Sequence, residues 1–266
     1  EKRLLATALA VPCPSQTVEH MYEVSADYWH HVRERLKAKY GAGVVVLGFS
    51  GPAGDQVPRA MLRRAAEARM ERLRKLSRKQ ELARRIVTAF DETWEVIRAD
   101  LRTDVPFAHR VERFQVPGRK LTDQEYEAAK KGYADYAKRD EKDSGVFSRK
   151  RWYKSTLDRY EAQQKVEPVN ALEIHVLRVG DLVLATNPYE LFADYAMRIH
   201  GRSPAGQTML VQLASPADAR HSYLPSERAV KGGGYSAVPE SSLVGPEGGQ
   251  ALVERTLTAI NELFKK

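Results

Sequence analysis

The sequence predicts an α/β protein with a mixed, mostly parallel sheet covered by helices and a charge-rich helical excursion. Three observations lead to this class. Short apolar runs of strand length alternate with longer amphipathic stretches. The 266 residues, 42% of them hydrophobic, can bury one large core. A polar stretch at 103–168 interrupts the alternation. We therefore expect one domain over residues 1–266, with 103–168 as a polar helical insertion.

The N-terminal third predicts two strands and the helices that follow them. Residues 4–11 form an apolar run that is typical of a buried strand. Ser25 is a plausible N-cap for a helix that runs through Tyr40 and ends at Gly41. A second short strand is expected at 44–47. A glycine-rich loop and an Arg-rich helical region to about Leu101 complete this part.

The insertion and the C-terminal part carry clearer local signals. Helical stretches are expected near 122–138 and 148–164, the first opened by a capping box of Thr122 and Glu125. Two apolar runs around Gly180-Asp181 predict a β-hairpin. Another strand is expected at 208–214, and an amphipathic helix closes the chain at 248–264.

The net charge of +8 is concentrated in one segment. Residues 59–85 contain eleven Lys or Arg and three Glu, an excess that equals the charge of the whole chain. A solvated helix face is the ordinary interpretation, and an electrostatic footprint for nucleic acid or anionic lipid is the alternative. Aromatic residues are not interleaved with the basic ones, so we expect no nucleic-acid partner. No window of 18 apolar residues exists, so we expect no transmembrane segment.

The loop "GFSGPAGDQVPR" at 48–59 ends the second strand and is the first candidate for a site. A phosphate-binding P-loop is excluded because no Lys follows Gly54. The glycine spacing also differs from a dinucleotide fingerprint. Ser50 is a poor candidate for a nucleophile elbow, because Pro52 stands where that motif needs its final glycine. Asp55 either caps the following helix or faces a site at the carboxyl edge of the sheet.

Three other loops are expected at the same edge. They follow the first strand at 13–16, the hairpin at 187–190 and the last strand at 215–247. Together they contain cysteine, glutamate, histidine and tyrosine, which are residue types that bind zinc, although no pair has the spacing of a helical zinc motif. We predict that Cys13, Asp55, Glu190 and His221 converge at one rim of a shared sheet.

Four segments together resemble the neutral/alkaline ceramidase family. These are "VSADYWHHVRERLKAKYG", "GPAGDQVPR", "LRVGDLVLATNPYELF" and "HSYLPSERAVKGGGYSAVPESSLVGPEGGQALVERTLTAINEL". The resemblance implies a zinc-containing α/β domain that hydrolyses the amide of ceramide, with two His, a Glu and a Tyr as ligands. It also implies an exported, periplasmic or extracellular, bacterial enzyme of lipid metabolism.

The resemblance assigns ligands residue by residue. Glu190 matches the zinc-binding glutamate. Cys13 stands where the family has a histidine, and a thiolate is also a good zinc ligand. The zinc-binding tyrosine of the family aligns near Arg220 or His221, and His221 could take its place as a ligand. Zn²⁺ is thus the expected cofactor. The second family histidine belongs to an N-terminal half, so a further segment of the same protein is an expected partner.

The same comparison places Val57 where the family has its catalytic serine. Valine can neither attack a carbonyl nor donate a hydrogen bond. The first hypothesis is therefore a ceramidase-like, metal-dependent hydrolase of an amide (N-acyl) bond. In it Asp55 and Arg59 shape the site or orient a small-molecule or lipid-like substrate, and Tyr223 stabilises an oxyanion. The alternative is a non-catalytic ceramidase-fold protein that binds a lipid or a carbohydrate.

Overall fold

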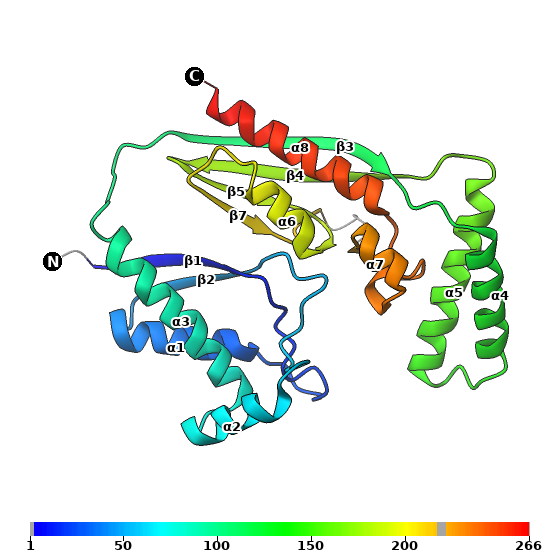
Figure 1. The fold of residues 1–266 in the computed structure, drawn as a ribbon, viewed down its shortest axis with the longest axis horizontal. Helices are drawn as coiled ribbons and strands as arrows, with labels where there is room; N and C mark the ends of the chain where they lie inside the picture. Colours follow the sequence, from blue (N-terminus) through cyan, green and yellow to red (C-terminus); the bar gives the residue numbers. More distant parts are fainter. Residues whose placement is uncertain (1–2, 217–221, 266) are drawn as a thin grey trace.

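The computed structural model describes residues 3–216 and 222–265 and confirms the mixed α/β class (Figure 1). Helices lie against sheets that contain parallel and antiparallel strand pairs. The described strands are β1 (Ala6–Val11), β2 (Val45–Ser50), β3 (Phe107–Pro117), β4 (Val169–Val179), β5 (Leu182–Thr186), β6 (Glu190–Leu191), β7 (Gln207–Val211) and β8 (Tyr223–Leu224). The described α-helices are α1 (Asp27–Tyr40), α2 (Arg64–Arg74), α3 (Arg78–Ile97), α4 (Asp123–Ala137), α5 (Ser144–Gln163), α6 (Ala193–His200), α7 (Glu227–Gly232) and α8 (Pro246–Phe264).

The described strands form three hydrogen-bonded sheets. β1 pairs with β2 in parallel, and β6 pairs with β8 in parallel. The largest sheet has the order β3-β4-β5-β7, in which the first two pairs are antiparallel and the last is parallel. The predicted hairpin is confirmed, because Gly180, at φ 66°, turns β4 into β5. The carboxyl ends of β2, β5 and β7 meet at one edge, where the candidate site lies.

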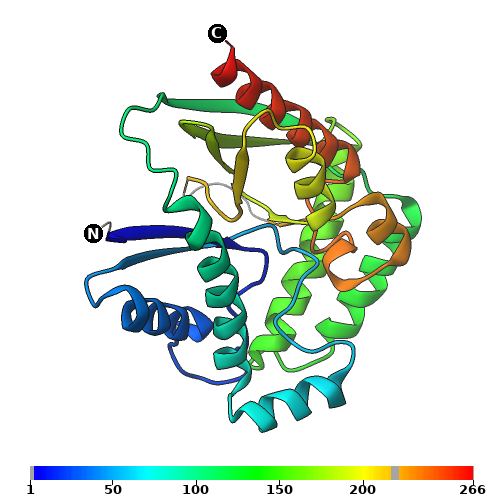
Figure 2. The same ribbon diagram turned by 60° about the vertical axis from the view of Figure 1, so that its left-hand side comes forward.

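Two cores support these sheets (Figure 2). In the N-terminal core, α1 and α3 pack against β1 and β2. The Trp29 ring lies against Gly48 so closely that a Cβ atom there would be 2.7 Å from it. In the larger C-terminal core, α6 and α8 cover the β3-β4-β5-β7 sheet with Tyr195, Leu252 and Ile260, which are almost completely buried.

Three local expectations need correction. The first long helix starts at Asp27 with Ala26 as its N-cap, and the Ser25 hydroxyl only accepts a hydrogen bond from the Asp27 amide (3.1 Å). The Arg-rich region forms two helices, because Lys75 takes a left-handed conformation (φ 54°) and Ser77 starts a new capping box. Asp55 does not cap the helix that follows it, since α2 has Arg63 as its N-cap.

The 103–168 segment contains one long strand and a hairpin of two helices. Its extended part, β3, pairs along its whole length with β4 at the edge of the largest sheet. Its helices, α4 and α5, pack on each other and stand beyond the end of that sheet (Figure 1). The predicted capping box of Thr122 and Glu125 is confirmed at the start of α4. Over the described ranges, no helix is both long and apolar enough to cross a membrane.

The basic 59–85 segment is partly neutralised by its own glutamates. The carboxylate of Glu81 is fully buried and accepts hydrogen bonds from Arg74, Arg84 and Arg85 at 2.8–2.9 Å. Two further carboxylates, those of Glu67 and Glu71, bind Arg78 of α3, and Glu67 also binds Arg85. These ion pairs join α2 to α3, so much of the basic charge has a structural role.

Candidate functional site

The loops after β1, β2 and β7 meet at one edge through backbone hydrogen bonds. The Gly51 amide donates to the Val11 carbonyl (2.9 Å), which joins the ends of β1 and β2. The Gln212 amide donates to the Ser50 carbonyl (3.0 Å), which joins the end of β7 to that of β2. This edge therefore connects the two cores.

The buried side chain of Gln212 is the centre of this junction. Its carbonyl oxygen accepts from the Ala53 amide (2.9 Å) and from the Leu191 amide (3.0 Å). Its amide nitrogen donates to Ser50 Oγ (3.3 Å). One polar side chain thus holds the glycine-rich loop, β6 and β7 in a fixed arrangement, and all these groups are satisfied away from water.

Gly54 allows the glycine-rich loop to touch the strand that carries Glu190. The Gly54 amide donates to the Leu191 carbonyl (2.9 Å). A Cβ atom at Gly54 would lie 2.2 Å from the Glu190 carbonyl oxygen, so no side chain fits there. The 48–59 loop and Glu190 are therefore neighbours, which is the placement that the sequence predicted for these two elements.

Glu190 and Tyr223 are neighbours at the β6–β8 junction. The two residues are Cα partners in the parallel ladder, and the Tyr223 hydroxyl stabilises the charged form of the Glu190 carboxylate. Burial raises the pKa of Glu190, while the hydrogen bond from Tyr223 opposes this shift. Burial, with the nearby Glu190 charge, raises the pKa of Tyr223 well above its usual range. Tyr223 consequently remains a hydrogen-bond donor at every pH near neutrality.

Asp55 and Arg59 lie on the same loop but hold structural contacts. One Asp55 carboxylate oxygen accepts from the Ala193 amide (3.0 Å), so this side chain caps the start of α6 across 138 positions of sequence. Arg59 forms an ion pair with Glu19. Val57, which stands where the resemblance expects a catalytic serine, lies between them and is 49% exposed.

Cys13 lies in the loop after β1 beside α1. The Tyr28 hydroxyl donates to the Cys13 carbonyl (2.6 Å), and Asp27 accepts from the Thr17 amide (2.8 Å). This loop is thus fixed by the first turn of α1. Burial raises the pKa of the Cys13 thiol, against the opposing effect of Arg78. The charged groups that act on the thiol, Arg78 and Asp27, belong to α3 and α1.

His221, a predicted zinc ligand, lies outside the described residues. Within 3–216 and 222–265, no group of three or more His, Cys, Asp or Glu side chains is arranged to hold a metal ion. Glu190 and Tyr223 offer two neighbouring oxygen donors, which is fewer than the three or four protein ligands of a zinc site. The described donors alone do not fit a zinc ion.

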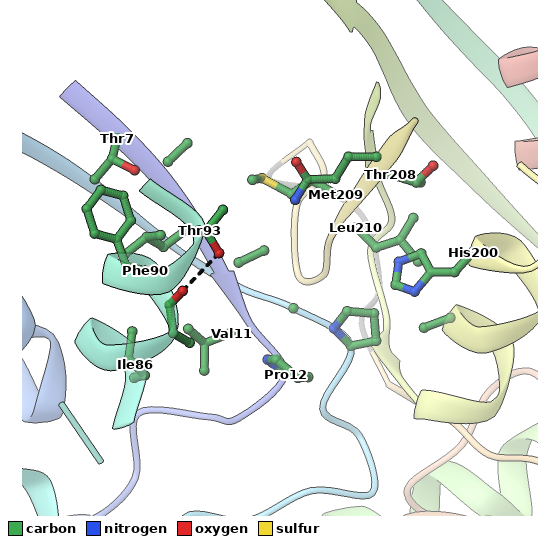
Figure 3. A pocket seen from close by; sticks show the side chains of 18 of the residues that line it. Thr7, Val11, Pro12, Ile86, Phe90, Thr93, His200, Thr208, Met209 and Leu210 are labelled. Carbon is green, nitrogen blue, oxygen red and sulfur yellow. Dashed lines mark hydrogen bonds between the residues drawn. The ribbon is translucent and has the colours of Figure 1, made fainter. Parts of the chain in front are cut away.

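A cavity of about 560 Å³ opens between the two cores. Figure 3 shows Ile86 and Phe90 of α3 on one side and Thr208, Met209 and Leu210 of β7 on the other. Pro12, Gly51 and Pro52 close its end at the carboxyl edge of the strands. Its volume and its mostly apolar lining are typical of small-molecule pockets. The cavity therefore reaches the same loops that surround Glu190.

Three residues near the pair were not anticipated. Gln212 sits in an ordinary strand-end sequence, and nothing local marks its three hydrogen bonds. The ring centroids of Tyr235 and Tyr223 are 5.8 Å apart, and those of Trp152 of α5 and Tyr235 are also 5.8 Å apart. In the sequence, the spacing of Trp152 and Thr156 places both on one face of a helix. The structure shows that Thr156 on this face is buried.

The fold of this chain is similar to that of neutral ceramidases. The crystal structure of neutral ceramidase from Pseudomonas aeruginosa matches with a TM-score of 0.59 and 14% identity, over 97% of this chain and 44% of that one. A second structure, a ceramidase complexed with C2, matches with a TM-score of 0.58 and 13% identity, over 97% and 46%. This chain thus spans less than half of either. No family model and no curated protein matches the sequence.

Proposed function

We propose that this chain is part of a ceramidase-like hydrolase that cleaves an amide (N-acyl) bond in a lipid-like substrate. The observation that carries the proposal is the Glu190–Tyr223 pair, half-buried at the edge where the loops meet. A carboxyl group of raised pKa beside a neutral phenol is a combination suited to moving a proton and stabilising an oxyanion.

The proposed reaction uses water as the nucleophile. Val57 replaces the serine of the resemblance, so no acyl-enzyme is formed on this residue. The Glu190 carboxylate takes a proton from a water molecule as its oxygen attacks the amide carbon. As Glu190 becomes protonated, the Tyr223 hydroxyl turns from its carboxylate and donates its one hydrogen bond to the carbonyl oxygen, which becomes negative. Glu190 then returns the proton to the nitrogen, and the C–N bond breaks to give a carboxylic acid and an amine.

Asp55 and Arg59 shape the site in this proposal without touching the amide. Asp55 fixes the start of α6, directly after the strand that bears Glu190. Arg59 fastens the glycine-rich loop to the Glu19 segment. Zinc is a proposed alternative to the general-base role of Glu190, as the cofactor that the resemblance implies. In that case Glu190, Cys13 and His221 would hold the ion, and the ion would polarise the carbonyl and activate water.

The test is hydrolysis of a panel of N-acyl amides by the full-length protein, with and without added zinc. Glu190→Ala should remove turnover. Glu227 is an exposed glutamate that is paired with Lys231 in the closing segment, residues 222–245, so Glu227→Ala should keep turnover. Measured zinc below about 0.1 per chain would remove the metal from the proposal. Turnover that is equal in wild type and Glu190→Ala would refute the assigned role.

A second candidate function is non-catalytic binding of a lipid. It is favoured by Val57 at the serine position and by the apolar cavity between α3 and β7. In this case the full-length protein would bind N-acyl amides without any turnover, whether zinc is added or not. Glu190→Ala would then leave the affinity unchanged, which separates the two functions.

A further inference from the structure

One face of α5 points toward the segment that carries Tyr223 and Tyr235. Arg149, Trp152, Thr156 and Arg159 follow one another at spacings of three, four and three residues, which places them on one side of a helix. Tyr153, the next residue, lies on the adjoining side, where its ring fills the space beside Gly132 of α4. This α5 face therefore belongs to the candidate site rather than to the helical hairpin.

The inner end of this face holds the closing segment in place. Arg159 donates to the Pro239 carbonyl (2.7 Å) and to the Ser242 carbonyl (3.2 Å). Arg119 donates to the Ala237 carbonyl (2.6 Å). Burial, with the nearby Arg119 charge, lowers the pKa of Arg159 to about 10. Two buried arginines thus fix the backbone on which Tyr235 stands, and Thr156 is buried beside them.

The outer end of the face is an open aromatic platform. The Arg149 guanidinium lies over the Trp152 ring at 4.3 Å from its centre. Trp152 contacts the ring of Tyr235, which is 63% exposed, and Tyr235 contacts Tyr223. A continuous line of contacts therefore leads from the guanidinium to the carboxyl group of Glu190.

Arg149 and Arg151 differ from the neighbouring lysines of α5. Lys150 is paired with Glu141, and Lys154 with Asp158. Neither arginine has an ion pair with any residue in 3–216 or 222–265, and Arg149 is the one whose ring partner, Trp152, contacts Tyr235. A guanidinium over an aromatic ring, with no carboxylate on it, keeps its donors available for an anion. An apolar platform next to such a donor suits a molecule that has both an apolar part and a negative charge.

We propose that Arg149, Trp152 and Tyr235 form a binding subsite for an N-acyl compound whose acyl chain ends in a carboxylate or another acidic group, with the chain along the aromatic rings and the acidic group on Arg149. This inference deepens the proposed function by naming the substrate class, and it rests on that function only for the placing of the amide at Glu190. The 103–168 segment then has a direct role, since it supplies both Arg149 and Trp152.

The test measures binding to the full-length protein by calorimetry with three probes. Suberic acid monoethanolamide has the chain with the charge at its far end, N-octanoylethanolamine has the chain without the charge, and N-acetylglycine has the charge without the chain. We expect suberic acid monoethanolamide to bind roughly 5- to 10-fold more tightly than either of the others, as one charge-assisted contact at a partly exposed site allows.

Arg149→Gln should remove the preference for suberic acid monoethanolamide and leave the affinity for N-octanoylethanolamine unchanged. Arg151→Gln is the matched control, because Arg151 lies over Phe147 on an exposed part of the same helix and its loss changes the net charge equally. Trp152→Leu should weaken both probes that carry the long chain by roughly 5-fold. Arg149→Lys keeps the charge and should keep part of the preference, which guards against a folding defect in Arg149→Gln.

Equal affinities for the three probes, or equal effects of the Arg149 and Arg151 variants, would overturn the subsite. Tight binding of N-acetylglycine would show a site for small anions and would also overturn it. The proposed function fails separately. If binding follows the expected pattern but no amide is hydrolysed, the subsite stands and the catalytic role of Glu190 falls. If hydrolysis depends on Glu190 but not on Arg149, the catalytic role of Glu190 stands and the subsite falls.

Discussion

Burial sets the direction in which the pKa of Glu190 is shifted, and Tyr223 acts against it. Burial raises the pKa of Glu190, and the phenol opposes this shift by stabilising the charged form. Because Glu190 must be ionised to accept a proton from water, activity should fall as the pH decreases through its raised pKa. The acid limb of the rate profile is therefore expected above the value of about 4.5 of an ordinary glutamate.

The Tyr223→Phe variant tests this coupling. Without the phenol, the carboxylate loses this stabilisation and the pKa of Glu190 should rise further, so the acid limb should move to higher pH. The measurement is kcat/KM against pH for wild type and variant. Tyr235→Phe is the control, because its ring contact with Tyr223 is kept. An acid limb at the same pH in both variants would contradict the coupling.

Glu81 is the residue on which the α2–α3 pairing depends most. Its hydrogen bonds with Arg84, then Arg85, hold its pKa at about 2, although burial acts in the opposite direction. Glu81→Gln should lower the free energy of unfolding by about 2–3 kcal/mol at pH 7, because three partly exposed arginines lose the buried carboxylate that they share. Glu71→Gln, at a partly exposed carboxylate bound only by Arg78, should cost much less.

The pH dependence of this effect has a defined sign. The folded-state pKa of Glu81 lies below its unfolded value of about 4.5, so its contribution is complete above that value. It disappears as the pH falls from about 4.5 toward 2. Urea unfolding of wild type and Glu81→Gln at several pH values measures the difference. A difference that is the same at pH 3 and pH 7 would contradict the assignment.

At the scale of elements, the α4–α5 hairpin keeps the closing segment ordered. Arg159 satisfies the carbonyls of Pro239 and Ser242, and Arg159→Met would leave both without this donor. Amides in 238–243 should then exchange with deuterium at least about 10-fold faster, as the local opening free energy drops by about 1.4 kcal/mol or more. Arg151→Met, on the exposed part of α5, should leave their exchange unchanged. Unaltered protection in Arg159→Met would disprove this role of the hairpin.

The elements differ in how far the sequence predicted them. The hairpin at Gly180 and the capping box of Thr122 are local signals, and both are confirmed. The extent of β3 was not predictable from alternation, because Arg110 on its helix-facing side is paired with Glu262 of α8 instead of being apolar. The capping of α6 by Asp55 joins residues far apart in sequence, so no local pattern could show it.

The candidate site was predicted only in part, for a related reason. Strand-end loops can be placed at one edge from the order of strands, and the contact of Gly54 with Glu190 agrees with that placement. Which side chains then touch depends on tertiary geometry. Nothing in the sequence indicated that Tyr223 would pair with Glu190, or that α5 would bring Trp152 to Tyr235. The predicted roles of Cys13 and His221 stay predictions.

At the scale of the whole molecule, Gln212 joins the two cores. Gln212→Leu would leave the buried amides of Ala53 and Leu191 without an acceptor. The free energy of unfolding should fall by about 3 kcal/mol, at the usual penalty for two unsatisfied buried donors. Gln207→Leu, at an exposed position of β7, should change it little.

Loss of the Gln212 junction should also uncouple the cores. Trp29 and Trp94 both belong to the N-terminal core, so fluorescence follows this core preferentially, whereas far-UV circular dichroism reports on the whole chain. We expect the two unfolding curves to coincide in wild type and to separate in Gln212→Leu. Coincident curves in the variant would mean that other contacts join the cores.

The most direct test of the central claim, that Glu190 and Tyr223 act together on an amide, is a double-mutant cycle on kcat/KM for N-acyl amide hydrolysis by the full-length protein. We predict that Glu190→Gln lowers kcat/KM by about 100-fold or more, and that adding Tyr223→Phe to it costs much less than Tyr223→Phe costs alone. Losses that add independently, or a Glu190→Gln variant as active as wild type, would contradict the account.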